Sequence, residues 1–246
     1  MDRLIWTAVT GMNAAMTRQR VIASNMANAQ TIGFRAEVLR ASAMTLKGPA
    51  VEARAMTLAE VRGAIMTPGT MVATGRPLDV AMQGEALLTV QAPDGTEAYT
   101  RRGDLSVSPA GLLVNGEGFA VLGDGGPISL PPGATVTIAE DGAVLTRDPA
   151  SPDAPATQVA QLKLASPAGS ETVKGLDGLF RVAGGGILPA DAQARLAIGT
   201  LEQSNVKPSE VLVEMVEAQR AFDMRTKLIA TAKELDEGGA SLMRLG

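Results

Sequence analysis

The chain has 246 residues, which is enough for one large domain or two smaller ones. Its formal net charge of -4 argues against a basic nucleic-acid-binding face, and its aromatic content of 2% argues against a large aromatic enzyme core. Cysteine and histidine are absent, which excludes disulfides, the usual catalytic triads and most zinc sites. We therefore expect no catalytic residue, no metal site and no cofactor.

Residues 1–35 predict an N-terminal helix with one apolar face. Apolar residues recur at alternate spacings of four and three, a pattern typical of a helix that packs along a seam. Gln19 alone interrupts this pattern. The polar Thr7, Thr10 and Asn13 break the apolar run, so a cleaved secretory signal is not expected. The N-terminal seam residues are Ile5, Ala8, Met12, Ala15, Ile22 and Met26.

The stretch Ser24 to Arg35 predicts the end of this helix. Side-chain amides at Asn25 and Asn28 compete for backbone hydrogen bonds, and Gly33 favours the left-handed conformation that commonly ends helices. Phe34 is expected to turn inward as an anchor. The predicted helix-end motif is Ser24, Asn25, Ala27, Asn28, Gly33 and Phe34.

The middle of the chain predicts β-structure. Residues 36–76 are interpreted as an extended linker with short strands, broken at Gly48-Pro49, and either a hairpin or a loop fits them. Residues 77–198 predict an all-β domain, because short strands alternate with frequent turn signals. The low aromatic content predicts a core of aliphatic residues. The segments predicted as strands after residue 82 are 87–91, 97–101, 105–108, 112–114, 119–122, 128–130, 135–138, 143–146, 159–165, 172–174, 179–182 and 194–198.

Carboxylates are the remaining candidates for catalysis. A pair of them at suitable spacing could hydrolyse glycosides. Most acids of the middle region stand beside glycine or proline, however, where aspartate is expected for its bonds to the turn backbone. We favour the turn interpretation for Asp94, Asp104, Asp124, Asp141 and Asp148.

Residues 199–246 predict a second helix. Pro208 suits the first turn, and the apolar pattern supports about seven turns to Leu235. Gly238-Gly239 is expected to bend or end the helix. The C-terminal seam residues are Val211, Met215, Ala218, Phe222 and Ile229.

The predicted fold class is α+β: N- and C-terminal helices paired as a coiled-coil-like module, with an inserted all-β domain. The pattern alone allows a pair of helices packed within one chain. Two helices bury only one side of each other, however, so their remaining apolar surface favours self-assembly or docking on related proteins.

Several segments resemble the bacterial flagellar basal-body rod and hook proteins. Ser24-Asn-Met-Ala-Asn-Ala-Gln-Thr-Ile-Gly-Phe-Arg35 resembles the signature that closes their N-terminal helix. Leu201-Glu-Gln-Ser-Asn-Val206 and Glu217-Ala-Gln-Arg-Ala-Phe222 resemble their C-terminal helix, and Gly75-Arg-Pro-Leu-Asp-Val-Ala-Met-Gln-Gly84 resembles their β-domain. The opening Met-Asp-Arg-Leu-Ile-Trp-Thr is similar to proximal-rod members, with distal-rod and hook-type members as the alternatives.

This resemblance implies a non-enzymatic structural subunit of the flagellar rod, the drive shaft that transmits torque. The implied partners are other rod proteins, copies of this chain and the flagellar type III export apparatus, without nucleic acid or membrane insertion. The implied location is the periplasmic rod, reached without signal cleavage. Both sets of seam residues are then subunit-interface residues. The alternative from a different class is a secreted carbohydrate-binding or peptidoglycan-acting β-domain protein.

Overall fold

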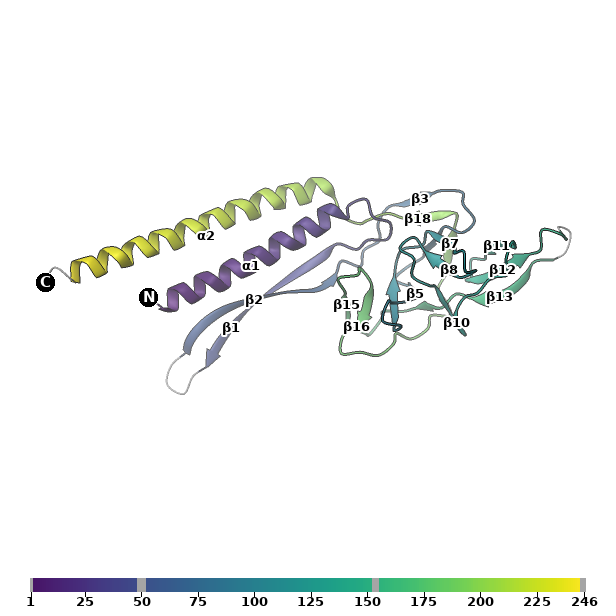
Figure 1. Ribbon diagram of the computed structural model, residues 1–246, viewed down its shortest axis with the longest axis horizontal. Coiled ribbons are helices and arrows are strands. Elements are labelled where there is room, and N and C mark those ends of the chain that lie inside the picture. The colour runs from purple at the N-terminus through teal and green to yellow at the C-terminus, as the bar shows by residue number, and fades with distance from the viewer. Residues whose placement is uncertain (1, 48–51, 152–154, 244–246) are drawn as a thin grey trace. The chain divides into compact units, whose positions relative to one another are not determined.

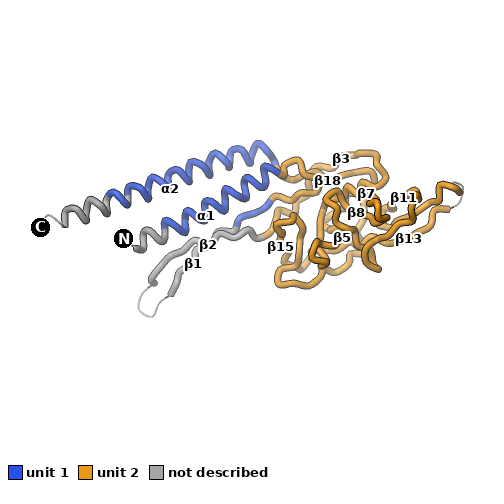
Figure 2. Tube along the Cα trace, viewed as in Figure 1, with its two compact units in different colours: residues 1–27, 37–62, 207–246 blue, residues 28–36, 63–206 orange. Residues whose placement is uncertain are grey.

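The chain has an α+β fold that divides into two compact units. A computed structural model describes residues 2–47, 52–151 and 155–243, with side chains described over 8–39, 63–151, 155–231, 233 and 234. Unit 1 contains residues 1–27, 37–62 and 207–246, and unit 2 contains residues 28–36 and 63–206 (Figure 2). The chain therefore passes between the units four times.

Long helices belong to unit 1, and most strands belong to unit 2 (Figure 1). The helices are α1 (Asp2–Ala27) and α2 (Pro208–Met243). The strands are β1 (Glu37–Lys47), β2 (Glu52–Ala64), β3 (Met71–Ala73), β4 (Val80–Met82), β5 (Leu87–Gln91), β6 (Glu97–Thr100), β7 (Leu105–Val107), β8 (Leu113–Asn115), β9 (Leu122–Gly123), β10 (Gly126–Pro127), β11 (Thr135–Ile138), β12 (Ala143–Arg147), β13 (Thr157–Gln161), β14 (Leu164–Ala165), β15 (Thr172–Lys174), β16 (Phe180–Val182), β17 (Leu196–Ile198) and β18 (Thr200–Glu202).

In unit 1, α1 and α2 lie side by side and run in opposite directions (Figure 1). Gln19 Nε2 donates to Gln219 Oε1 at 2.9 Å, and Arg225 Nη1 donates to the Gly11 carbonyl at 3.0 Å. The earlier residue of α1 thus meets the later residue of α2, as an antiparallel pair requires. β1 also contacts α1.

β1 and β2 pair in a two-stranded sheet. They have 11 and 13 residues, so they are longer than the short strands predicted for this region. The predicted break at Gly48-Pro49 lies outside the described residues.

The bounds of α2 differ from the sequence prediction. The helix begins at Pro208, whereas residues 200–202 form β18, which pairs antiparallel with β3. Leu201 and Glu202 are buried, so packing inside unit 2 overrides the helical pattern there. α2 also continues through Gly238-Gly239 to Met243. Each glycine costs only about 1 kcal/mol relative to alanine in a helix, which the helix-favouring residues on both sides offset.

Unit 2 is built from antiparallel strands around two apolar clusters. The largest sheet has the order β14-β5-β6-β16-β15, and a three-stranded sheet has the order β11-β12-β13. Alternate residues of β5 enter different clusters, because Leu88 and Val90 pack in the larger one and Leu87 packs with Tyr99 in the smaller one. Both faces of the central sheet are therefore covered.

The predicted aliphatic core is confirmed: the buried members of the larger cluster are Val, Leu, Ile, Ala and Met82. The predicted β5–β6 hairpin is also present, with Gln91 opposite Glu97. The segments predicted at 135–138 and 172–174 are β11 and β15. Residues 128–130 are not a strand, because Ser129 makes only an isolated bridge with Leu112.

Candidate functional site

Four of the five aspartates considered above are engaged in local contacts. Asp94 Oδ1 accepts from the Thr96 amide at 2.9 Å and hydroxyl at 2.6 Å, and these bonds hold the Asp94 pKa below its ordinary value. Asp141 accepts from the Ala143 amide at 3.0 Å, and Asp148 accepts from the Ala150 amide at 2.9 Å. Asp104 is paired with Arg102 at 2.8 Å. The backbone bonds of Asp94, Asp141 and Asp148 are what the turn interpretation predicts. For Asp104 that interpretation is wrong, because this residue forms an isolated β-bridge with Asp79.

A partly open pocket of about 460 Å³ lies in unit 2 and includes Asp124 and Asp141 in its lining. Asp191, Lys163 and Arg195 also line it. Lys163 is paired with Glu97 at 2.7 Å, so this cation already has a partner. Within the described parts of the chain, no group of three acidic residues could hold a metal ion.

The seam residues predicted from the sequence are covered to different degrees. Ala15 and Ile22 on α1 and Val211 and Ala218 on α2 are buried. The side chain of Ile5 lies outside the described residues. The half-buried seam residues are Ala8, Met12, Met26, Met215, Phe222 and Ile229.

α2 carries a second apolar face that the seam pattern does not include. Successive helix residues are about 100° apart, so the exposed apolar residues of this second face lie on the side of α2 opposite the seam. Glu217, Arg220 and Lys227 interrupt this face. We call it the outer face; its apolar residues are Val213 (59% exposed), Val216 (52%), Met224 (65%) and Leu228 (64%).

α1 also presents apolar side chains to solvent. Val9 and Met16 are 44% and 47% exposed, and their spacing of seven residues places them on one side of the helix. Sequence analysis missed these residues and most of the outer face, because it searched for one apolar stripe per helix. Two separate stripes on α2 were the signal available in the sequence.

The helix-end motif makes two sets of contacts. α1 ends at the exposed Ala27. In unit 1, Asn25 Oδ1 accepts from the Glu37 amide at 2.8 Å, Asn25 Nδ2 donates to the Glu37 carbonyl at 3.1 Å, and Ser24 Oγ donates to the Glu37 carboxylate at 3.2 Å. Asn28 begins unit 2, where its carbonyl accepts from the Thr31 amide at 3.1 Å. Asn25 therefore holds the first residue of β1.

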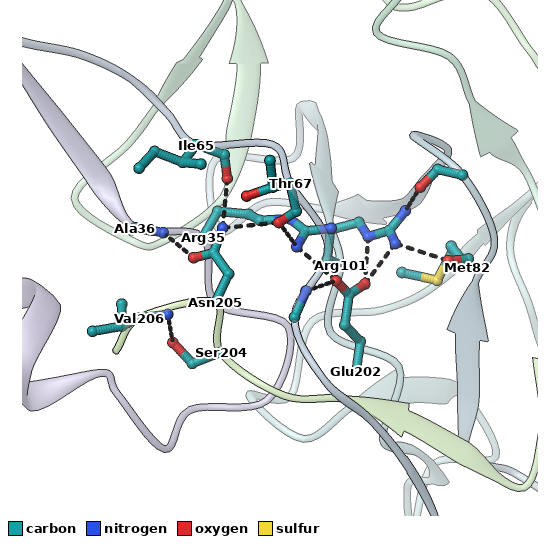
Figure 3. Close-up of polar contacts among 12 residues, drawn as sticks. Arg35, Ala36, Ile65, Thr67, Met82, Arg101, Glu202, Ser204, Asn205 and Val206 are labelled. Atoms are coloured by element: carbon teal, nitrogen blue, oxygen red, sulfur yellow. Dashed lines mark hydrogen bonds and ion pairs between the residues drawn. The ribbon is translucent and has the colours of Figure 1, made fainter. Parts of the chain in front are cut away.

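Arg35, which directly follows this motif, belongs to a buried charge network in unit 2 (Figure 3). Arg35, Arg101 and Glu202 are each 1% exposed. Arg35 Nη1 lies 2.6 Å from Glu202 Oε1, and Arg101 Nε donates to Glu202 Oε2 at 2.8 Å. The Gly69 amide donates to Glu202 Oε1 at 2.8 Å. One carboxylate thus joins segments that are far apart in the sequence.

The two arginines of this network are bonded differently. Arg101 Nη1 donates to the carbonyls of Gly84 and Ala86, and its Nη2 donates to the Met82 carbonyl at 2.8 Å. Arg35 Nη1 donates to the Thr67 carbonyl at 2.6 Å, but Arg35 Nε is buried without a hydrogen-bond partner in the described chain. Burial lowers the pKa of Arg35, Glu202 raises it and Arg101 lowers it. The Arg35 guanidinium remains charged at neutral pH.

Asn205 holds the same region through its side-chain amide (Figure 3). Its Oδ1 accepts from the Ala36 amide at 2.7 Å, and its Nδ2 donates to the carbonyls of Ile65 at 2.8 Å and Thr67 at 2.9 Å. The Ile65 amide donates to the Ala36 carbonyl at 2.8 Å. Three segments, 33–36, 65–69 and 202–206, are therefore tied together inside unit 2.

Close backbone approach explains two glycines in these segments. Gly33 has φ of 66° and donates its amide to the Glu202 carbonyl at 2.7 Å. A Cβ on Gly33 would lie 2.4 Å from the Arg101 carbonyl carbon, and a Cβ on Gly69 would lie 1.9 Å from the Gln203 carbonyl oxygen. Gly33 has the left-handed conformation expected from the sequence, but it serves this contact rather than the end of α1.

Phe34, which was expected to be an anchor, is 8% exposed, and Lys174 Nζ lies 3.2 Å from the centre of its ring. Sequence analysis did not identify Arg101, Glu202 or Asn205 as site residues. Charged side chains are rarely buried, so single-sequence patterns give no reason to pair Arg101 with a carboxylate 101 positions away.

None of the described helices is long and apolar enough to cross a membrane. The sequence also matches three family models in chain order. The model described as flagella basal body rod protein matches residues 5–35, and the model of the flagellar hook protein FlgE/F/G D1 domain matches residues 81–146. The flagellar basal body rod FlgEFG protein C-terminal model matches residues 198–242. These matches include both terminal helices and part of unit 2.

Curated relatives match over nearly the full length of the chain. The flagellar basal-body rod protein FlgF of Salmonella typhimurium is 41% identical over 98% of both chains. FlgF of Escherichia coli is 40% identical over 95% of both, and the rod protein FlgG of Borreliella burgdorferi is 31% identical over 96% of both. The chain therefore belongs to the flagellar basal-body rod protein family, as a structural rod subunit similar to FlgF.

Proposed function

We propose that this rod subunit assembles through its terminal helices and that the outer face of α2 packs against a neighbouring subunit. In place of the subunit-interface role expected for the seam residues, we propose that they hold α1 and α2 together within one chain, while the outer face provides the contact between chains. Torque then passes along the rod through many such packed interfaces, without chemistry. The observation that carries this proposal is the presence of two apolar faces on opposite sides of α2.

The exposure of its apolar side chains explains why the outer face favours a partner that would bury them. Val213, Val216, Met224 and Leu228 are each more than half exposed. Covering the exposed part of one such side chain contributes about 1–2 kcal/mol, so a few of them make a substantial contact. The charged residues between them favour a partner with complementary charges over non-specific hydrophobic association.

The remaining parts of the proposal follow from family membership. The partners are other rod proteins and copies of this chain, and export by the flagellar type III apparatus supplies the subunit without signal cleavage. The assembled subunit lies in the periplasmic part of the basal body and acts without catalysis. Ala8, Met12 and Met26 on α1 and Met215 and Ile229 on α2 complete the helix pair, which we propose to be coiled-coil-like.

Two aspartate substitutions on α2 separate the roles of its faces. Met224→Asp places a charge on the outer face, so it should leave the helicity of the free subunit unchanged and reduce incorporation into rods by about 10-fold or more. Phe222→Asp places the charge on the seam side, so it should lower both helicity and incorporation. Circular dichroism measures the first property, and quantitative immunoblotting of purified basal bodies measures the second.

Val159→Asp is the matched control, because Val159 is also exposed, at 39%, but lies on β13 in unit 2. This variant should be incorporated normally. Normal incorporation of Met224→Asp would show that the outer face is not a subunit contact. Loss of helicity in free Met224→Asp would show instead that this face is needed within the chain.

A deletion tests the requirement for α1. Removing residues 1–27 leaves segment 28–36 and its Arg35 in unit 2. The shortened protein should keep the β-sheet signal of unit 2 and fail to enter rods. Continued incorporation would contradict assembly through the terminal helices. A longer deletion to residue 35 would not be a clean test, since it also removes a partner of Glu202.

A further inference from the structure

We propose that Glu202 is a positioning residue that couples two segments of the chain: the N-terminal segment 28–36 and the C-terminal segment 200–206 each dock more stably in unit 2 when the other is docked. Both segments belong to unit 2, and each continues directly into a part of unit 1. The proposed coupling acts in the free protein. It can therefore be tested separately from rod assembly.

Arg101 is the fixed member of the network. It directly follows β6, and the carbonyls of Met82, Gly84 and Ala86 hold both of its terminal nitrogens. None of these three groups belongs to a terminal segment. The position of this buried positive charge is thus set by contacts outside both terminal segments. Its Nε donates to Glu202.

Arg35 is the member that the N-terminal segment contributes. The Thr67 carbonyl accepts its hydrogen bond, but the charge of Arg35 is offset only by Glu202 among the contacts described for it. Arg101 opposes the charge of Arg35 and lowers its pKa, after the larger effects of burial and Glu202. An N-terminal segment docked without Glu202 would therefore bury a second positive charge beside the first.

Glu202 is the member that the C-terminal segment contributes. Its carboxylate meets both arginines and the Gly69 amide, and its carbonyl accepts from the Gly33 amide at 2.7 Å. A C-terminal segment docked without Arg35 would lose part of this compensation. Each segment is consequently favoured in its place by the presence of the other, which is a reciprocal coupling.

Hydrogen exchange on the full-length free protein tests this coupling. Glu202→Gln keeps the shape of the side chain and removes its charge. Exchange of the Gly33 and Ala36 amides should become about 100-fold faster, because their segment loses its charge partner. The amides of Thr89 and Gln91, which bond to the carbonyls of Lys163 and Ala120 in the β-core, serve as internal references and should be unaffected.

Arg35→Met provides the reciprocal arm. Exchange of the Gln203 amide, which donates to the Thr70 carbonyl, should become at least about 10-fold faster although the substitution lies in the other segment. Glu117→Gln is the control, since Glu117 makes a more exposed ion pair with Arg102 at 3.2 Å. It should change none of these rates.

Two outcomes would overturn the proposal. In one, each substitution accelerates exchange only within its own segment. In the other, the reference amides accelerate as much as the segment amides, which would mean that the network supports the whole unit uniformly. If Glu202→Gln fails to fold, the response of Gln203 to Arg35→Met decides between coupling and its absence.

Discussion

Gly33 and Gly75 have nearly the same backbone conformation but different surroundings. Their φ values are 66° and 71°. A Cβ on Gly33 would meet the Arg101 backbone at 2.4 Å, whereas a Cβ on Gly75 would have no atom within 4 Å. The pair therefore separates the cost of left-handed backbone from the cost of close approach.

Gly75→Ala should lower the free energy of unfolding by about 1–2 kcal/mol, the cost of a side chain in the left-handed region. Gly33→Ala should lower it by clearly more, because the Arg101 backbone must also move. Urea unfolding followed by circular dichroism measures both changes. Equal losses of unfolding free energy in the two variants would show that the close approach of Gly33 to Arg101 does not affect stability.

Tyr99 is the only tyrosine of the chain and is fully buried in the smaller cluster of unit 2. Burial raises its pKa from 10.0 to about 12; the bond from the Leu188 amide opposes this shift, and Glu97 adds to it. The folded pKa lies above the unfolded one. The stabilising effect of neutral Tyr99 is therefore complete below pH 10 and is lost as the pH rises to 12.

Absorbance of the tyrosinate ion follows this titration without interference from another tyrosine. Native protein should show ionisation near pH 12, or together with unfolding at lower pH, while urea-unfolded protein should titrate near pH 10. A separate native-state transition near pH 10 would mean that the Tyr99 hydroxyl is not buried as described.

At the scale of the elements, sequence periodicity predicted the helices and strands whose formation depends on the local residue pattern. It predicted both terminal helices and the frequent short strands, while the low aromatic content predicted the aliphatic core. It did not predict β18, because Leu201 and its neighbours also fit the apolar pattern of the helix that follows. Its pairing with β3 and the ion pairs of Glu202 with the two arginines, all distant in the sequence, favour the strand conformation.

The buried charges of the candidate site could not be predicted from the sequence. Arg35 stands beside Phe34 in a motif that the sequence analysis singled out, yet nothing local indicates that its guanidinium is buried. The seam of α2 could be predicted because its apolar residues repeat at spacings of four and three. The second stripe, on the outer face, was missed because charged residues interrupt it, as on an exposed helix surface.

Gly11 offers a test of the energetics of α1. A Cβ at this position would have open space around it. Gly11→Ala should therefore stabilise the free subunit by about 0.5–1 kcal/mol, through the higher helix propensity of alanine. Ala15→Gly is the matched control and should be destabilising, since Ala15 is buried in the same helix. Lower stability of Gly11→Ala would show that the helix pair needs this glycine.

At the scale of the whole molecule, the chain separates two tasks between its units. Unit 1 contains the helices that we propose to be the assembly element, and unit 2 contains the two apolar clusters and the buried charge network. Asn25 and Asn205 bond to the consecutive residues Glu37 and Ala36, each within its own unit. The crossing of the chain between Ala36 and Glu37 is thus anchored on both sides.

Thiol labelling of Met224→Cys is the most direct test of the central claim, because the absence of native cysteine leaves one reactive site. The side chain at this position is 65% exposed in the free subunit, so a maleimide reagent should label the free protein readily. In purified basal bodies the same cysteine should be protected, since the outer face of α2 is then covered by a neighbouring subunit. Equal labelling of free and assembled protein would contradict assembly through this face.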